Sequence, residues 1–458
     1  MNIQRRWFAG VDWARESHHV RLTDEHGNDV GERIFTHGGA GLAEMASWLT
    51  TTCQADAPEI HVAIEVPHGP VVETLMERGF AVYAINPQQL DRFRDRFSVS
   101  GAKDDSRDAR ALASALRTDP QCFRHLTPVD PTVVELREWS RIADEVVAER
   151  NRLTNRMREQ LWRYFPAFLK LDEDLGADWL LDFWELAPTP LKARRVREPT
   201  VAKLLKRNRI RRFDAAHVLA IAREEPVTVQ AGTMEAATAH IATLVARLRL
   251  INRQLADAHR QIDALTARLV GGEESEPGQP VEQHDAAILR SLPGVGRIVL
   301  ATLLAEAWEP LRRRDYHALR NLCGVAPVTR RSGKTSIVLR RRACHPRLAN
   351  AVYHWARVAV QNDRVSRAKY EALRDRGHGY ARALRSDAGR RGSSTQRAPH
   401  SSPLPSIRSC RSQATPCCGR WVSPCASDSD VAAFGLGRGP AGWPSSRGRA
   451  LCDAAFVA

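Results

Sequence analysis

A seven-residue spacing of apolar side chains constrains this chain more than any other feature. It runs through residues 241–269, and a second apolar set fills the alternate positions. An apolar stripe kept over four heptads predicts a coiled coil, because a helix needs that spacing when it packs lengthwise along another helix. The seven-residue set is Ile241, Leu248, Leu255, Ile262 and Leu269, and the second set is Leu244, Ile251, Ala258 and Leu265.

The partner of this stripe is expected in a second long helix. Residues 132–165 carry apolar positions at helical spacing among arginine and glutamate, which predicts an amphipathic helix. The two helices can pair within one chain or between protomers. We expect a helical hairpin that also supports oligomerisation, and charged residues at Ile251 and Leu255 would test that role.

Residues 5–125 are expected to form an α/β domain. Short apolar runs with turn residues between them predict strands at 7–13, 18–23, 30–35, 60–65 and 80–85. Helical patterns fall at 41–49, 71–78 and 105–116. Strands that alternate with helices predict a mixed sheet covered by helices.

Acidic residues mark particular points of this domain. Asp12 and Glu65 end two of the buried strands, and Asp105 and Asp108 lie three apart on one helix face. Four carboxylates that converge would bind Mg²⁺ or Mn²⁺, which prefer hard oxygen ligands. Each acid also has an ordinary explanation, as a strand end or a helix cap. Asp104 competes with Asp105, and spacing alone does not choose between them.

The central part, residues 130–270, contains a basic block at 192–212. Ten lysines and arginines there face one glutamate, within a chain of net charge +15, so we expect phosphate binding. The nucleic-acid-binding candidates are Arg194, Arg195, Arg207 and Arg211. Nearby aromatic residues are expected in the core rather than in base stacking: Trp179, Phe183, Trp184 and Phe213.

A polar, Gly/Pro-containing linker at 271–280 precedes a C-terminal domain at 281–387, expected to be α-helical. Its Pro-Gly-Val-Gly turn lies between two helical patterns and resembles a helix-hairpin-helix element. Gly294 and Gly296 would then let a phosphate approach the backbone and a helix N-terminus. An ordinary turn between two helices is the alternative.

Ser332 follows in a cationic setting, with Arg331 and Lys334 beside it and Arg341 further on. Cations next to a hydroxyl suit attack on phosphorus, because they neutralise the charge that develops there. A phosphate-binding turn or a plain loop is the alternative for so short a motif, and Ser336 is the second candidate serine.

Composition changes within the last seventy residues. From Gly389 the chain holds nine arginines and three aspartates but no lysine or glutamate, and five of its nine cysteines. Residues 388–458 are therefore expected to be a disordered basic tail, or the frame-shifted end of a gene. No apolar run is long enough for a membrane span, no leader is visible and no CxxC pairs occur, so we expect a cytoplasmic protein without a membrane partner.

Three motifs together resemble a known family. GVDW with Asp12, AIEVPHG with Glu65, and KDDSRDARALA are similar to motifs of the DEDD-type insertion-sequence transposases of the IS110 family, relatives of the Piv-type invertases. The resemblance covers residues 7–387. It implies a RuvC-like, ribonuclease-H-like N-terminal domain, it selects Asp105 and Asp108 over Asp104, and it makes Ser332 the nucleophile.

The resemblance further implies what the protein does. It would be a DNA transposase or recombinase that joins to DNA through Ser332, with Mg²⁺ (or Mn²⁺) on the four carboxylates. Its partners would be the double-stranded DNA of the element ends and target, a structured bridge RNA and further protomers, in a bacterial cytoplasm at the nucleoid. The alternatives are a metal-dependent structure-specific endonuclease and a non-catalytic nucleic-acid-binding protein.

Overall fold

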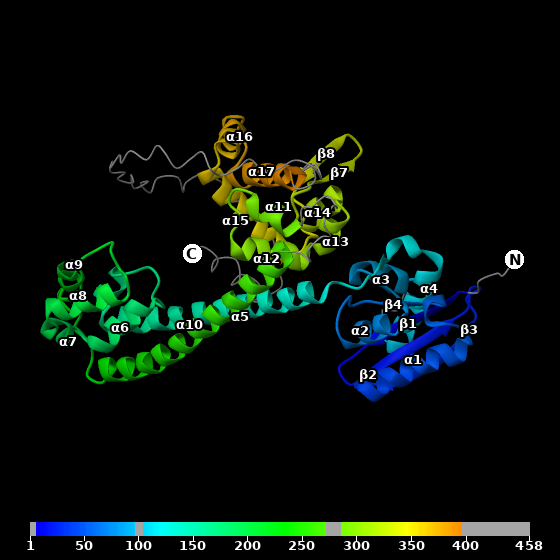
Figure 1. Cartoon of the computed structure of the whole chain (residues 1–458), viewed down its shortest axis with the longest axis horizontal. Helices are drawn as coiled ribbons and strands as arrows, with labels where there is room; N and C mark the ends of the chain where they lie inside the picture. Colours follow the sequence, from blue (N-terminus) through cyan, green and yellow to red (C-terminus); the bar gives the residue numbers. More distant parts are fainter. Residues whose placement is uncertain (1–5, 97–103, 272–284, 395–458) are drawn as a thin grey trace, which may run out of the picture. The chain divides into compact units, whose positions relative to one another are not determined.

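The fold is described from a computed structural model, in residues 6–96, 104–271 and 285–394 (Figure 1). The chain divides into two compact units, one ending at Asp130 and the other beginning at Pro131. The linker expected at 271–280 lies outside the described residues except for Gly271, which ends a helix. Among the described residues, no helix combines the length and the apolar character that crossing a bilayer requires.

The N-terminal unit is built on a six-stranded sheet. Strands β1 to β3 form an antiparallel meander, β4 and β5 continue from β1 in parallel, and β6 closes the edge antiparallel to β5, giving the order β3-β2-β1-β4-β5-β6. All five predicted strands are present. The strands are β1 (Trp7–Trp13), β2 (Ser17–Thr23), β3 (Asp29–Thr36), β4 (Ile60–Ile64), β5 (Ala81–Ala84) and β6 (Arg124–His125).

Helices cover both faces of this sheet. One face packs on α1 (Gly39–Cys53) and α2 (Pro70–Glu77) through Val11, Val62 and Ile64. The opposite face packs on α3 (Pro87–Arg94) and α4 (Asp105–Thr118) through Phe8 and Ala63. The mixed α/β prediction is confirmed, and α3 was not predicted. Short 3₁₀ turns complete the unit: η1 (Ala57–Glu59) and η2 (Pro120–Cys122).

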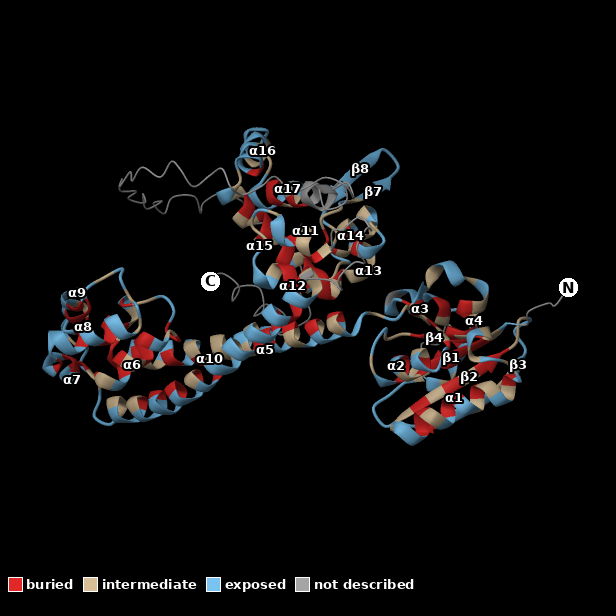
Figure 2. Ribbon diagram, viewed as in Figure 1, coloured by how far each residue is buried: buried red, intermediate tan, exposed pale blue. Residues whose placement is uncertain are grey.

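Two long helices form a central hairpin in the second unit. Helices α5 (Pro131–Tyr164) and α10 (Thr233–Gly271) run antiparallel, since Arg247 pairs with Glu149 at 3.0 Å and Arg268 donates to Thr132 at 3.4 Å. Figure 2 shows buried and exposed positions interleaved along both helices. The hairpin predicted from the apolar stripe is therefore present within one chain.

Intrachain packing uses the apolar stripe itself. Ile241, Leu248 and Ile251 enter one core cluster, while Ile262 and Leu265 enter another. Ile251 is only 3% exposed, so a charge at this position would disrupt the hairpin instead of testing oligomerisation. Oligomerisation stays a prediction, and any surface that supports it has to be sought away from these side chains.

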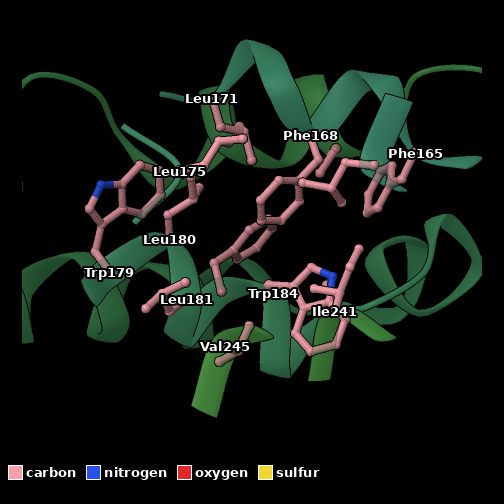
Figure 3. Close-up of a cluster of buried hydrophobic side chains, with 14 of the residues drawn as sticks. Phe165, Phe168, Leu171, Leu175, Trp179, Leu180, Leu181, Trp184, Ile241 and Val245 are labelled. Carbon is pink, nitrogen blue, oxygen red and sulfur yellow. The ribbon is translucent and has the colours of Figure 1, made fainter. Parts of the chain in front are cut away.

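The first core cluster joins the far end of the hairpin to a set of short helices (Figure 3). Trp179, Phe183 and Trp184 are buried there and Phe213 packs against them, so the expected core role of these aromatic residues is confirmed. The elements are η3 (Pro166–Lys170), α6 (Asp178–Leu186), α7 (Pro190–Arg195), α8 (Glu198–Arg207) and α9 (Ala215–Ala222).

The second cluster joins the other end of the hairpin to the C-terminal helices. A two-stranded ribbon interrupts these helices, although the sequence predicted an all-helical region. The last helix continues through Ser394, past the point where the tail was expected to begin, and residues 395–458 lie outside the described part. The elements are α11 (Asp285–Ser291), α12 (Arg297–Glu306), α13 (Trp308–Arg312), α14 (Tyr316–Leu322), β7 (Val328–Ser332), β8 (Thr335–Leu339), α15 (Pro346–Asn362), α16 (Arg364–Asp375) and α17 (Tyr380–Ser394).

Candidate active site

Strand geometry brings Asp12 and Glu65 to one face of the sheet. Side chains alternate between faces along a strand, so Asp12 shares the face of Phe8, and Glu65 shares that of Ala63. Strands β1 and β4 pair in parallel with Val11 opposite Ile64, and both acids are the next residues along. The two carboxylates therefore lie side by side on the face that α3 and α4 cover.

Gly10 allows α4 to lie directly on β1. A Cβ at this position would come within 1.9 Å of the Ala109 carbonyl oxygen and 2.7 Å of the Ala113 nitrogen. Only a strand residue without a side chain, facing alanines on the helix, permits so close an approach. The first turn of α4 is thereby held against the end of β1, where Asp12 lies. Sequence reasoning missed this role of Gly10.

The first turn of α4 supplies the remaining two acids. Asp104 is the N-cap, and its side chain accepts a hydrogen bond from the Ser106 backbone N–H at 3.3 Å. Asp108 is buried and Asp105 is exposed. Asp105 and Asp108 both act electrostatically on Asp12. This favours Asp105 over Asp104 as a member of the cluster.

This arrangement changes the pKa of the Asp12 carboxyl group. Its pKa is raised from 3.8 to about 6, first by burial and then by the negative charges of Asp108 and Asp105. Arg94 lowers the pKa, and Glu65 raises it by the smallest amount. An acid held so close to other acids needs a compensating cation.

Arg94, at the end of α3, supplies part of that compensation. Its Nε and Nη2 atoms donate to the two carboxylate oxygens of Asp108 at 2.6 and 2.8 Å, and Nη2 lies 3.6 Å from Glu65. Arg94 also contacts Asp91 on its own helix, at 2.5 Å. Sequence reasoning missed this residue, because its role depends on where α3 packs.

The arrangement is close to a metal site without forming one. Among the residues that the structure describes, no three His, Cys, Asp or Glu side chains are grouped tightly enough to hold an ion. Arg94 lies between Asp108 and Glu65 instead. One guanidinium among four carboxylates leaves net negative charge, and the donors are all hard oxygens, so the residues fit Mg²⁺ or Mn²⁺.

A polar network fixes the start of α4 over the sheet. The Ser106 hydroxyl donates to Glu32 of β3 at 2.5 Å, and Arg21 of β2 reaches Ser106 at 3.3 Å. Arg21 also pairs with Glu32 at 3.0 Å and with Asp29 at 2.6 Å. These contacts hold the helix turn that carries Asp105 and Asp108.

Ser332 lies in the second unit, at the end of β7. It pairs with Thr335 across the two-residue turn Gly333-Lys334, and Gly333 has the positive φ of +55° that such a turn needs. Arg331 and Lys334 are exposed beside it. Every residue of the ribbon except the half-buried Val328 is exposed (Figure 2), so the hydroxyl is presented to solvent among cations.

The two glycines of the proposed helix-hairpin-helix turn have different surroundings. Gly294 has φ +83°, and an added Cβ would lie 3.0 Å from the Ala359 nitrogen of α15, so intrachain packing already accounts for this glycine. Gly296 is exposed as the N-cap of α12, with open space around it. Arg341 is half-buried, and its Nε has no hydrogen-bond partner among the described residues.

The basic block is exposed along α7, α8 and the turn that follows. Its members differ in their partners. Arg207 pairs with Asp182 at 2.5 Å, and Arg194 lies 3.5 Å from Glu225. Arg195 and Arg211 form no ion pair with any residue in the described ranges, so their charges are the most available to an outside anion.

Comparison with known proteins finds similarity over most of the chain. A family profile for DEDD transposases of the IS110 type, described as "Transposase", matches residues 9–166, and one described as "Transposase IS116/IS110/IS902 family" matches residues 286–371. The y4uE protein of Sinorhizobium fredii, which carries the name transposase, is 71% identical over 216 residues. That match covers 47% of this chain but only 60% of the relative.

Longer matches come from Streptomyces coelicolor. Its IS117 mini-circle protein, also named as a transposase, is 33% identical over 387 residues, or 82% of this chain and 90% of the relative. An uncharacterised 43.6 kDa protein of insertion element IS110 is 28% identical over 82% of this chain and 90% of its own length. The chain therefore belongs to the IS110 family of DEDD transposases.

Proposed function

We propose that this chain cleaves and rejoins DNA strands to move an insertion element. The observation that carries the proposal is the position of Asp12 and Glu65 on the face of the sheet that α4 covers, with Asp105 and Asp108 in the first turn of α4 and the pKa of Asp12 raised to about 6. Four acids held together against their mutual repulsion are typical of a site that binds cations and phosphate. The strand order also supports the expected RuvC-like, ribonuclease-H-like fold.

The four carboxylates would hold Mg²⁺ or Mn²⁺. A bound divalent ion would neutralise charge on the scissile phosphate and favour departure of the leaving oxygen. Glu65 and Asp12 contribute from adjacent strands, while Asp105 and Asp108 contribute from α4. Arg94 would release Asp108 as the cation takes its place.

Ser332 would be the nucleophile. Its Oγ attacks phosphorus and forms an O–P bond, the bond from phosphorus to one bridging oxygen breaks, and that oxygen leaves as a strand-end hydroxyl. The serine proton is lost and the leaving oxygen gains one. Arg331 and Lys334 lie beside the serine on the exposed ribbon and would stabilise the added negative charge.

The covalent step has a direct test. Incubation of the full-length protein with element-end DNA and Mg²⁺ should give a protein–DNA adduct, and Ser332→Ala should remove the adduct while DNA binding persists. Ser336→Ala is the matched control, because it changes a nearby serine of the same ribbon. Adducts that survive in Ser332→Ala would move the nucleophile elsewhere, and free hydrolysed ends without any adduct would favour the endonuclease alternative.

Nucleic acid would contact the protein at several further places. The candidates remain Arg194, Arg195, Arg207, Arg211, Gly294, Gly296 and Arg341, of which Arg195 and Arg211 have the most available charge. We extend the proposal to a structured bridge RNA and to assembly of several protomers, both of which rest on family membership and on the exposed basic block.

A further inference from the structure

A cavity of about 620 Å³ lies in the C-terminal part of the second unit, apart from the carboxylate cluster and from Ser332. It is bounded by the end of α14, the segment after β8, the first turns of α15, and α17. Figure 1 shows α17 beside α14 and α15, and α17 contacts both of these helices. The His345 backbone N–H donates to the Leu322 carbonyl at 2.8 Å and so fixes the segment after β8 to α14.

The charged side chains that line this cavity are all positive. Arg340, Arg342 and Arg385 line it, and no acidic residue does. Within the described ranges, none of the three forms an ion pair with a carboxylate. By contrast, many other arginines of this unit pair with acids, as Arg347 does with Glu306 and Asp144. Three guanidiniums left together without a counter-ion create a strong local preference for an anion.

Arg385 shows the consequence of that crowding. Burial lowers its pKa below the ordinary value, and the positive charges of Arg340 and Arg382 lower it further. An anion seated between the arginines would relieve both effects, because it restores the interactions lost with water and opposes the repulsion.

The remaining wall suits the rest of a nucleotide. Val325, Pro346 and Leu384 are apolar, and Tyr353 and Asn350 add an aromatic ring and an amide. Sugar and base surfaces pack on such side chains, and an amide can donate to or accept from a base edge. The cavity volume exceeds what a lone phosphate group fills.

We infer that this cavity binds one nucleotide unit of a nucleic-acid strand, with its phosphate on Arg340, Arg342 and Arg385 and its nucleoside against the apolar wall. The inference rests on the proposed function only in taking nucleic acid as the source of the phosphate. DNA and RNA present the same phosphodiester, so the test separates them.

The test measures binding by the full-length protein through fluorescence anisotropy. The probes are a labelled 20-nucleotide single-stranded DNA, the corresponding duplex and an RNA of the same sequence. Arg385→Gln should weaken binding of at least one probe about fivefold and reduce the salt slope by about one. Arg385→Lys should restore much of the loss. Arg376→Gln, an exposed arginine outside the cavity, is the matched control and should change little.

A second pair of variants covers the case in which Arg385→Gln fails to fold by circular dichroism. Ala381 lies exposed on α17 at the cavity wall, so Ala381→Glu adds a negative charge there without removing a contact. Ala381→Glu should weaken binding, and Ala381→Lys, of similar length, should not.

Each result bears on the assignment. Loss confined to the DNA probes assigns the strand as DNA, and loss confined to the RNA assigns it as RNA. Equal affinities for Arg385→Gln and Arg376→Gln, or for Ala381→Glu and Ala381→Lys, on all three probes would overturn the inference. The nucleotide assignment would also fall if Arg385→Gln abolished a rise in melting temperature caused by inorganic phosphate but left the affinity for all three probes unchanged. No readout involves strand cleavage, so failure here is distinct from failure of the Ser332 step.

Discussion

The position of Asp12 changes the pKa of its carboxyl group and therefore its contribution to stability. In water its carboxyl would ionise near pH 4, whereas here its pKa is about 6. A raised pKa in the folded state means that the folded protein binds a proton that the unfolded chain has released. The contribution of Asp12 to stability is therefore fully present below about pH 4 and is lost as pH rises through about 6.

This gives a pH-dependent prediction. In the absence of divalent metal, wild type should become less stable relative to Asp12→Asn as pH is raised from about 4 to about 7, because the amide carries no charge to repel its neighbours. Thermal melts of both full-length proteins across this range check it, with the exposed Asp257→Asn as control. A constant difference between wild type and Asp12→Asn would contradict the electrostatic account.

Arg94 leads to a prediction about metal affinity. If Asp108 binds a cation as proposed, Arg94 would give up its paired contacts with Asp108, and hydrogen bonds to charged groups contribute about 1.5–3 kcal/mol each. Arg94→Gln should therefore bind Mn²⁺ about tenfold more tightly or better, as measured by titration calorimetry or by the paramagnetic resonance of free Mn²⁺.

The matched control for this change is Arg92→Gln, on the same helix but exposed. It should leave Mn²⁺ affinity unchanged. Arg94→Gln should also melt earlier than wild type without metal, and recover when Mn²⁺ is added. Unchanged affinity in Arg94→Gln would show that the guanidinium does not compete with the cation.

At the scale of elements, a buried acid joins three helices of the second unit. Glu306, at the end of α12, lies 3.3 Å from Arg141 of α5 and 2.5 Å from Arg347 of α15, and its side chain is only 6% exposed. Burial alone would raise its pKa, but the hydrogen bond from Arg141 and the surrounding cations outweigh burial and lower the pKa. The stability that Glu306 contributes is thus present above its ordinary pKa and is lost as pH falls.

Glu306→Gln should lower the free energy of unfolding by about 2 kcal/mol, because Arg141 and Arg347 lose a charged partner in a buried setting. Denaturant titration of the full chain at pH 7 checks this value. Glu138→Gln removes an exposed acid that pairs with the same Arg141 at 3.4 Å, so it should cost less than about 0.5 kcal/mol. Equal effects would mean that Glu306 does not hold the helices together.

At the scale of the whole molecule, the excess positive charge is divided between exposed and neutralised residues. The chain carries +15, but only part of the basic block is available to a polyanion. Arg195 and Arg211 are exposed without a described acidic partner, whereas Arg207 is paired with Asp182. Net charge alone therefore overstates the cationic surface that nucleic acid would meet.

The double change Arg195→Gln with Arg211→Gln should weaken binding to duplex DNA and reduce the slope of log K against log salt by about 2. Arg207→Gln, a change of the same kind on the same block, should have a smaller effect, because Asp182 already neutralises its charge. Anisotropy titrations at several salt concentrations measure both. A larger loss in Arg207→Gln would reverse this ranking.

The order of elements in the N-terminal unit could be predicted from sequence because each strand and helix has its own local pattern. Short apolar runs with turn residues between them placed the five strands, and the acids at the ends of β1 and β4 indicated the site. The β7–β8 ribbon was missed, since its five-residue strands are short, and only Gly333 with the β-branched residues Thr335, Ile337 and Val338 hinted at a hairpin. The three-part division of the chain stays a prediction.

By itself, the sequence determined the periodicity, the two long helices, the acidic residues and the family. Tertiary structure alone decided that Arg94 lies among the carboxylates, that Gly10 lets α4 touch β1, and that the apolar stripe is covered within one chain. The physical reason is the separation along the chain of the residues that determine each feature. A periodic pattern records which face of an element is buried, whereas the identity of what covers that face depends on contacts between residues far apart in the chain.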